Sequence, residues 1–161
     1  MLEKKIISLY EKTGALQKGH FVLSSGKRSS IYLQSAIVLS YPEHLKTISK
    51  SLTKKIKKIL DYKKIDLVVS PAMGGIVIGS KIGEELGVRA IFVERDGKNF
   101  CLRRGFRVKK DERVLIVEDV VTTGKSSKEC SNCIKKNGGV IVGLASIIDR
   151  SYKKLNFGIP Y

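Results

Sequence analysis

An apolar run that ends in two adjacent acids constrains this chain more than any other feature of its sequence. Residues 114–117 are all Val, Leu or Ile, which is the pattern of a strand buried on both faces. Glu118 and Asp119 follow at the carboxyl end, where open α/β sheets bind ligands. Residues 122–127 then offer backbone N–H groups and hydroxyls to a phosphate at a helix N-terminus. The segment therefore indicates a ligand with both a phosphate and a polyol, such as a sugar phosphate.

Two other interpretations of this segment are a structure without a ligand and a different phosphate loop. The simpler one is a buried strand, a turn and a capped helix without a ligand, although interior pairs of carboxylates are rarely placed without one. The other is a nucleoside-triphosphate P-loop, because Gly124, Lys125 and Ser126 imitate its end. That motif needs a first glycine five positions before the second, where this chain has Asp119. The loop is too short and too acidic to wrap a β-phosphate in that way.

The composition fits one globular domain. With 161 residues, 42% of them hydrophobic, the chain is long enough to bury a core and too apolar to be disordered. No apolar run approaches the roughly 20 residues of a membrane span. The amino terminus, MLEKK, lacks the apolar stretch of a signal peptide, and the three cysteines complete no zinc set. We therefore predict a soluble protein of the cytoplasm that has no membrane partner.

The net charge of +16, from 31 basic and 15 acidic residues, raises the hypothesis of a nucleic-acid partner. The lysines are spread along the chain, however. In residues 46–58 they alternate at helical spacing with Ile48, Leu52 and Ile56, as on the solvated face of an amphipathic helix. We therefore expect no nucleic-acid partner, and a general positive potential would also attract a polyphosphate substrate.

Strand and helix patterns alternate through the middle of the chain, which predicts a parallel sheet covered on both faces. Residues 95–112 are polar, basic and punctuated by glycine, and a stretch of this length inside an α/β domain is usually functional or mobile. The predicted helices are residues 2–12, 42–60, 74–86 and 124–137, and the predicted strands are residues 21–23, 31–33, 66–70, 88–93, 114–117 and 140–148.

The segment from Glu118 to Ser126 resembles the loop of type I phosphoribosyltransferases that binds phosphoribosyl diphosphate (PRPP). Four more segments narrow the resemblance to the orotate phosphoribosyltransferase family. They resemble, in chain order, the amino-terminal signature, the diphosphate-side loop, the mobile loop of the shorter members and the segment that closes the base pocket. They are residues 21–34 (FVLSSGKRSSIYLQ), 70–76 (SPAMGGI), 102–106 (LRRGF) and 148–150 (IDR).

The resemblance implies an α/β protein of the type I phosphoribosyltransferase fold, with a central, mainly parallel five-stranded sheet flanked by helices and a small N-terminal hood. Residues 1–161 would form one domain, with the hood at 1–36, the core at 37–161 and a mobile loop at about 95–112. The implied activity transfers ribose 5-phosphate from PRPP to orotate, giving orotidine 5′-monophosphate and diphosphate. The implied cofactor is Mg²⁺, held mainly by PRPP and water without direct protein ligands. A homodimer is also implied, with the mobile loop reaching the partner's site.

For PRPP the resemblance implies two acids for the ribose hydroxyls, a loop for the 5′-phosphate, and backbone N–H groups and cations for the diphosphate. Lys98, Asp119 and Glu118 are the catalytic candidates, and Lys98 is expected to stabilise the leaving group. Arg103 and Arg104 are secondary candidates, and an ordinary solvated basic loop is the alternative. The residues assigned to PRPP are Ala72, Met73, Gly74, Arg95, Lys98, Glu118, Asp119, Val120, Val121, Thr122, Thr123, Gly124, Lys125 and Ser126.

For orotate the resemblance implies a turn against the pyrimidine and an arginine for its carboxylate. Arg150 can form a charge-assisted pair with that carboxylate, and a surface ion pair with Asp149 is the alternative. The residues assigned to orotate are Ser25, Gly26, Lys27, Arg28, Tyr32, Leu33, Thr122 and Arg150.

This chain departs from the family pattern at three places. Many members have lysines where it has Ser24 and Gly74, and relatives usually continue past Tyr161. The first two departures move more of the positive charge to the mobile loop, and the third is expected to weaken the sheet edge, the dimer or the activity. Two other functions stay open. One is a PRPP- or nucleotide-sensing regulator that binds nucleic acid, and the other is a sibling transferase for another base.

Overall fold

The computed structural model describes the whole chain except Met1, residues 23–25, Lys27, Lys98 and residues 152–154. It forms two compact units, Met1–Ile48 and Ser49–Tyr161, and α3 runs from the first into the second. The elements in chain order are α1 (Leu2–Lys12), β1 (Leu16–Val22), β2 (Arg28–Leu33), α2 (Ser35–Leu39), α3 (Pro42–Ile59), a 3-10 turn η1 (Tyr62–Lys64), β3 (Leu67–Pro71), α4 (Gly75–Leu86), β4 (Arg89–Asp96), β5 (Asn99–Cys101), β6 (Arg113–Val121), α5 (Lys125–Lys136) and β7 (Val140–Asp149).

The second unit is built on a five-stranded sheet in the order β5-β4-β3-β6-β7. All neighbours are parallel except β4 and β5, which form an antiparallel hairpin. The chain runs outward from β3 to β4 on one side and from β6 to β7 on the other. The order therefore reverses between β3 and β6, and such a reversal is where α/β sheets hold their ligands. The predicted α/β class, with a mainly parallel five-stranded sheet, is confirmed.

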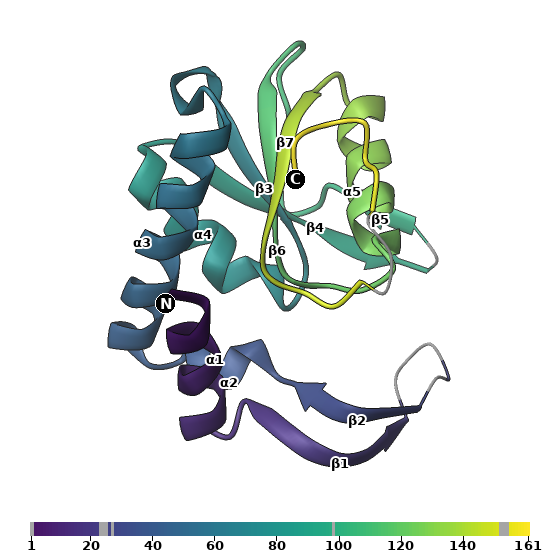
Figure 1. The fold of residues 1–161 in the computed structure, drawn as a ribbon. Helices are drawn as coiled ribbons and strands as arrows, with labels where there is room; N and C mark the ends of the chain where they lie inside the picture. The colour runs from purple at the N-terminus through teal and green to yellow at the C-terminus, as the bar shows by residue number, and fades with distance from the viewer. Residues whose placement is uncertain (1, 23–25, 27, 98, 152–154) are drawn as a thin grey trace. The chain divides into compact units, whose positions relative to one another are not determined.

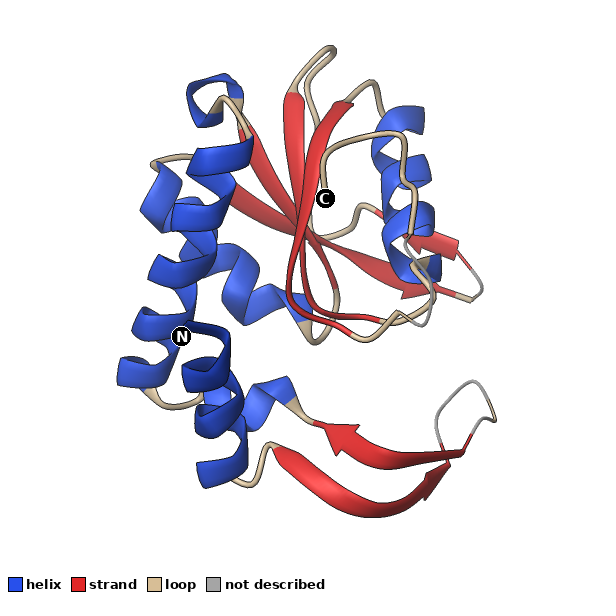
Figure 2. Cartoon of the chain, viewed as in Figure 1, coloured by secondary structure: helices blue, strands red, loops and turns tan. Residues whose placement is uncertain are grey.

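Helices cover both faces of this sheet. In Figures 1 and 2, α4 lies on one face with the C-terminal half of α3, and α5 lies on the other. This arrangement explains why every residue of β3 and most of β6 are buried, since neither strand has a face toward solvent. The core on the α5 side includes Ile116, Cys130, Ile134 and Leu144.

The first unit pairs a hairpin with short helices. β1 and β2 are antiparallel, and the rings of Phe21 and Tyr32 lie 5.5 Å apart between their centroids. Tyr10 of α1 is fully buried and its hydroxyl donates a hydrogen bond to Ser35 Oγ of α2 at 3.0 Å. Among the helices of the described residues, none is long and apolar enough to cross a membrane.

Two charge pairs connect the start of β6 with the starts of β3 and β4. Arg113 donates to both carboxylate oxygens of Asp66, at 2.8 Å from Nε and 2.7 Å from Nη2. These bonds lower the pKa of Asp66 to about 2. Arg89 Nη2 donates to Glu112 Oε2 at 2.9 Å and to the carbonyl of Arg107 at 2.7 Å. Because the pKa of Asp66 is lowered in the folded protein, the contribution of this group to stability is present above pH 3.8. It is lost as the pH falls toward 2.

The predicted helices and core strands are all present, but some boundaries and elements differ. β6 continues to Val121 instead of ending at Val117, so both acids lie within the strand. The short strands β1 and β2 are longer than predicted, and α2, η1 and β5 were not predicted. Gly97, with a φ of 59°, allows the tight turn into β5. The division into residues 1–36 and 37–161 and the mobility of residues 95–112 stay predictions.

We expect Gly79→Ala to destabilise the protein, because its new Cβ would overlap Ser70 Oγ on β3. Alanine usually gains about 1 kcal/mol over glycine inside a helix, whereas overpacking costs about 1–3 kcal/mol. Ser70 Oγ is buried without a hydrogen-bond partner, so Ser70→Ala alone should be neutral or stabilising. Urea unfolding of both single variants and the double variant measures the coupling. The exposed Ser80→Ala in the same helix is the control, and an unchanged or raised stability of Gly79→Ala would contradict the packing.

Candidate functional site

The carboxyl end of β6 sends its two acids to opposite faces of the sheet. The carboxylate of Glu118 meets Ser127 of α5. The carboxylate of Asp119 instead lies at the start of α4, so close to Gly74 that a Cβ there would stand 2.6 Å from Asp119 Oδ2. The alternation of side chains along a strand requires this divergence, since neighbours in sequence point to opposite faces. The two acids are therefore chemically different groups.

Glu118 is a buried acid with a buried hydroxyl partner. Only 6% of Glu118 and none of Ser127 is exposed, and Ser127 Oγ donates a short hydrogen bond to Glu118 Oε1. Burial, together with the nearby charge of Asp119, raises the pKa of Glu118 to about 7, against the opposing effect of the hydrogen bond from Ser127. Glu118 therefore changes its charge near neutral pH, which is typical of acids at functional sites.

Asp119 faces the loop that follows β3. The backbone N–H of Ala72 donates to the carbonyl of Val93 at 2.8 Å, and the peptide bond between Ala72 and Met73 is cis. Met73 is 79% exposed, and Gly74 stands immediately before α4. Because Gly74 has no side chain, the carboxylate of Asp119 can lie against it, and any larger residue at this position would displace Asp119. The pairing of β6 with β3 ends at Ile116, and the loop that follows β3 lies against the next residues of β6.

The predicted phosphate loop connects β6 to α5. Thr122 and Thr123 are exposed, and Thr123 Oγ1 accepts a hydrogen bond from the backbone N–H of Lys125 at 3.3 Å. Gly124 has a φ of 71° and is buried against Phe157, whose ring would lie 2.8 Å from a Cβ at that position. A side chain at Gly124 is thus excluded by conformation and by space. The α5 N-terminus follows at once and favours an anion.

Several of the predicted cations already have acidic partners. Arg95 Nη2 donates to Glu129 Oε2 of α5 at 2.7 Å, and Lys125 Nζ lies 3.8 Å from Glu129 Oε1. Arg104 makes a two-point contact with Glu94, at 2.8 Å and 2.9 Å. These bonds lower the pKa of Glu94 and hold the 102–106 segment to β4. Arg104 therefore has a structural role here. Glu129 holds Arg95 and Lys125 near the loop that connects β6 to α5.

The predicted orotate residues are found on both units. Gly26, Arg28, Tyr32 and Leu33 belong to the hairpin of the first unit, and all but Leu33 are exposed. Arg150 belongs to the second unit, where its backbone N–H donates to the carbonyl of Val121 at 2.8 Å. That bond ties the residue after β7 to the end of β6. Three predicted residues lie outside the described part of the chain: Ser25, Lys27 and Lys98.

Sequence reasoning missed the contacts of three residues of this region. They are Ser127, which was expected to offer its hydroxyl to a phosphate but donates it to Glu118, Glu129 on Arg95, and Phe157 on Gly124. The first contact had a signal in the sequence. Residues three and four apart share one face of a helix, so α5 turns one side toward β6 from Ser127 to Cys130. The contact of Phe157 with Gly124 depends on the path of the chain after β7, which no local sequence pattern predicts.

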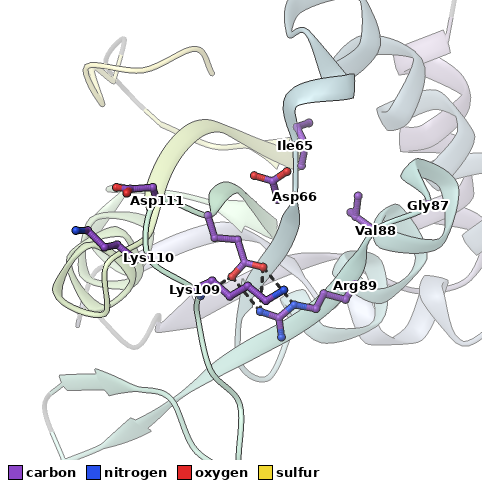
Figure 3. Close-up of a pocket in the computed structure, with 9 residues that line it drawn as sticks. Ile65, Asp66, Gly87, Val88, Arg89, Lys109, Lys110 and Asp111 are labelled. Atoms are coloured by element: carbon purple, nitrogen blue, oxygen red, sulfur yellow. Dashed lines mark hydrogen bonds and ion pairs between the residues drawn. The ribbon is translucent and has the colours of Figure 1, made fainter.

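A depression on the second unit lies at the other end of the sheet. It measures about 590 Å³ and is shown in Figure 3. Asp66, Arg89 and Glu112 line it, and all three are engaged in the charge pairs described above. β6 runs from this end to the acids, a length of roughly 20 Å. The depression is therefore remote from the chemistry of the loops.

A metal ion at the loops would take few ligands from this chain. In the residues that the structure describes, no three His, Cys, Asp or Glu side chains gather at one point. Asp119 is a carboxylate at the mouth of the site, and the loop around it supplies N–H and hydroxyl groups. This donor set fits Mg²⁺ that enters with a diphosphate and keeps several waters.

Comparisons with known proteins agree with this geometry. A family model described as the phosphoribosyl transferase domain matches residues 43–156. An orotate phosphoribosyltransferase of Caldanaerobacter subterraneus subsp. tengcongensis is 44% identical over 161 residues, which cover 100% of this chain and 83% of that relative. An orotate phosphoribosyltransferase of Erythrobacter litoralis is 46% identical with the same coverage.

The fold has solved counterparts. A crystal structure of orotate phosphoribosyltransferase from Aeropyrum pernix is similar with a TM-score of 0.72 at 24% identity. The similarity covers 92% of this chain and 93% of the other. At this identity the match shows a shared fold, and the curated relatives carry the argument about the family.

We expect Glu118→Gln to be more stabilising at pH 8 than at pH 5. The raised pKa means that Glu118 keeps its full contribution to stability below pH 4.5 and loses it as the pH rises through about 7. The difference is on the order of 3 kcal/mol, and Asp66 titrates too low to add to it. Urea unfolding at the two pH values measures it. The exposed Glu84→Gln should show no such difference, and equal effects of Glu118→Gln at both pH values would refute the raised pKa.

Proposed function

This chain belongs to the phosphoribosyltransferase family, and from that premise we propose that it is an orotate phosphoribosyltransferase. The reaction transfers ribose 5-phosphate from PRPP to orotate and releases diphosphate, a step of pyrimidine biosynthesis. The observation that carries the proposal is identity of 44% and 46% to curated members along the full length of this chain. The end of β6, where acids and a phosphate loop meet, supports it.

The reaction needs positioning and electrostatics more than a nucleophile. The bond from the ribose carbon to diphosphate breaks as a bond to the base nitrogen forms, and positive charge develops on the ribose. We propose that Glu118 and Asp119 hold the ribose hydroxyls from opposite sides, which their divergent directions support. The loop after them would bind the 5′-phosphate with N–H and hydroxyl donors at the start of α5. A fixed ribose lowers the barrier because no reorganisation is needed when charge develops.

The diphosphate would lie on the side of Asp119 and α4. The backbone from Ala72 to Gly74 can donate N–H groups there, whereas Glu129 holds Arg95 on the α5 side of the sheet. Mg²⁺, when bound, would neutralise charge on the diphosphate and favour its departure. We propose that Lys98 assists in this role, with Arg103 as the secondary candidate, because Arg104 is committed to Glu94.

The proposed binding of orotate depends on residues of the β1–β2 hairpin and on Arg150. Arg28 and Tyr32 offer a charge and an aromatic face, and Arg150 can pair with the orotate carboxylate. Closure of the 95–112 segment over a partner's site in a homodimer would exclude water and protect the activated ribose from hydrolysis. The dimer, the closure and a cytoplasmic location belong to this proposal.

The regulator alternative is less well supported. Exposed lysines occur on α1, α3, α5 and the loop before β6, so they are spread over elements of both units. Scattered cations of this kind favour a general positive potential over nucleic-acid recognition. The sibling transferase shares the fold, so only the substrate distinguishes it.

We expect the wild-type protein to consume orotate in the presence of PRPP and Mg²⁺, followed by the loss of orotate absorbance. Asp119→Asn should cut turnover about 100-fold or more with the fold retained, because it removes a charge beside the reacting ribose. Asp61→Asn, at an exposed position between α3 and η1, is the matched control. Turnover of a purine base without loss of orotate would reassign the substrate, and normal turnover in Asp119→Asn would remove this acid from the mechanism.

We expect Lys98→Ala to lower kcat by about 100-fold while changing the KM for orotate little, because it acts on the leaving diphosphate. Steady-state kinetics with each substrate varied in turn measure the two parameters. Lys135→Ala, an exposed cation on the last turn of α5, should leave both unchanged. If Arg103→Ala shows the loss and Lys98→Ala does not, the assignment passes to Arg103.

A further inference from the structure

We propose that Ser127 is a positioning residue that holds the Glu118 carboxylate in the direction needed to bind the PRPP ribose. This inference rests on the proposed function and assigns a role to a residue outside the loop of residues 122–126. Ser127 is the third residue of α5, and its hydroxyl is fully buried against Glu118 Oε1. Among the described residues it is the hydrogen-bond partner of that carboxylate.

The direction of the bond gives Ser127 its effect. A serine hydroxyl that donates to a carboxylate stabilises the ionised acid, and it does so strongly where water is excluded. The same contact fixes the carboxylate on the α5 side of β6, because Ser127 belongs to a regular helix that packs on that face. The second carboxylate oxygen then stays available for a ribose hydroxyl, which donates best to an ionised acid.

Three other titratable groups interact with Glu118, and they are Cys130, Tyr161 and Asp119. Burial raises the pKa of the Cys130 thiol on α5 well above its usual value. Burial also raises the pKa of Tyr161 on the C-terminal segment to about 12, and its hydroxyl lies 3.0 Å from Ser146 Oγ of β7. Asp119 on β6 adds a charge that disfavours ionised Glu118. Ser127 therefore opposes both burial and Asp119.

The surrounding cations cannot replace Ser127. Lys125 and Lys128 on the first turn of α5 are exposed, and Lys125 is directed to Glu129. Without the Ser127 hydroxyl, Glu118 would hold its proton to a higher pH and lose its anchor on α5. Binding of PRPP would then require a more alkaline solution.

The test is the pH dependence of kcat/KM for PRPP in Ser127→Ala, measured from pH 5.5 to 9.5. We expect the acid limb to move up by about one pH unit. The variant would therefore lose activity about tenfold below the wild-type midpoint and recover it near pH 9. Recovery at pH 9 in the same preparation shows that the variant is folded. Ser127→Thr, which keeps the hydroxyl, should restore the wild-type limb, and Ser131→Ala, one turn further along α5, should leave it unchanged.

An acid limb that stays in place in Ser127→Ala overturns the inference, as does a uniform loss of activity at every pH. If the wild type does not turn over orotate, the proposed function fails, and the pKa of Glu118 remains measurable by carbon NMR of labelled glutamate. A rise of that pKa in Ser127→Ala then supports the role of Ser127, and an unchanged pKa rejects it.

Discussion

Strand β6 is buried on both faces along most of its length, and the arrangement of the second unit depends on this constraint. A strand without a solvent face needs a helix on each side, which α4 and α5 provide. Where such a strand ends in two acids, one must point toward each helix. Glu118 therefore meets the hydroxyl of Ser127 in a closed environment, whereas Asp119 meets the backbone of the loop before α4. One short sequence thus produces two acids of different chemistry beside one phosphate loop.

The small residues around β6 follow from the same constraint. Gly74 leaves room for the carboxylate of Asp119, and Gly79 lets α4 approach Ser70. Gly124 adopts a left-handed conformation under the ring of Phe157. At these positions a methyl group would displace a neighbour. Close approach of the loops to β6 is the condition for a site between β3 and β6, where the strand order reverses.

Much of this could be predicted from the sequence. The alternation of buried strands and amphipathic helices predicts the parallel sheet, and the acids with their loop predict a sugar-phosphate site. The period-2 rule applied to β6 would also have predicted the divergence of Glu118 and Asp119 if the strand had been extended to Val121. The apolar run alone predicts a strand that ends at Val117, because charged residues are rarely found inside a buried strand.

Other parts depend on contacts between residues far apart in the chain. The pairing of Arg104 with Glu94 and of Arg95 with Glu129 requires the β4–β5 hairpin to lie near α5, and no local pattern encodes that. The sequence therefore identifies the basic residues of this segment but leaves open which of them are committed to acids. Phe157 packs on Gly124 for a similar reason, since the chain returns there after β7.

The central claim is that the end of β6 binds PRPP through an acid whose charge changes near neutral pH. The most direct test is calorimetric titration of PRPP with Mg²⁺ at pH 7 in two buffers of different ionisation enthalpy, for the wild type and for Glu118→Gln. Because the pKa of Glu118 is raised to about 7, we predict that the wild type releases about half a proton more per bound PRPP than the variant. We predict that this difference disappears at pH 9. An equal proton count for the two proteins at pH 7 would contradict the claim.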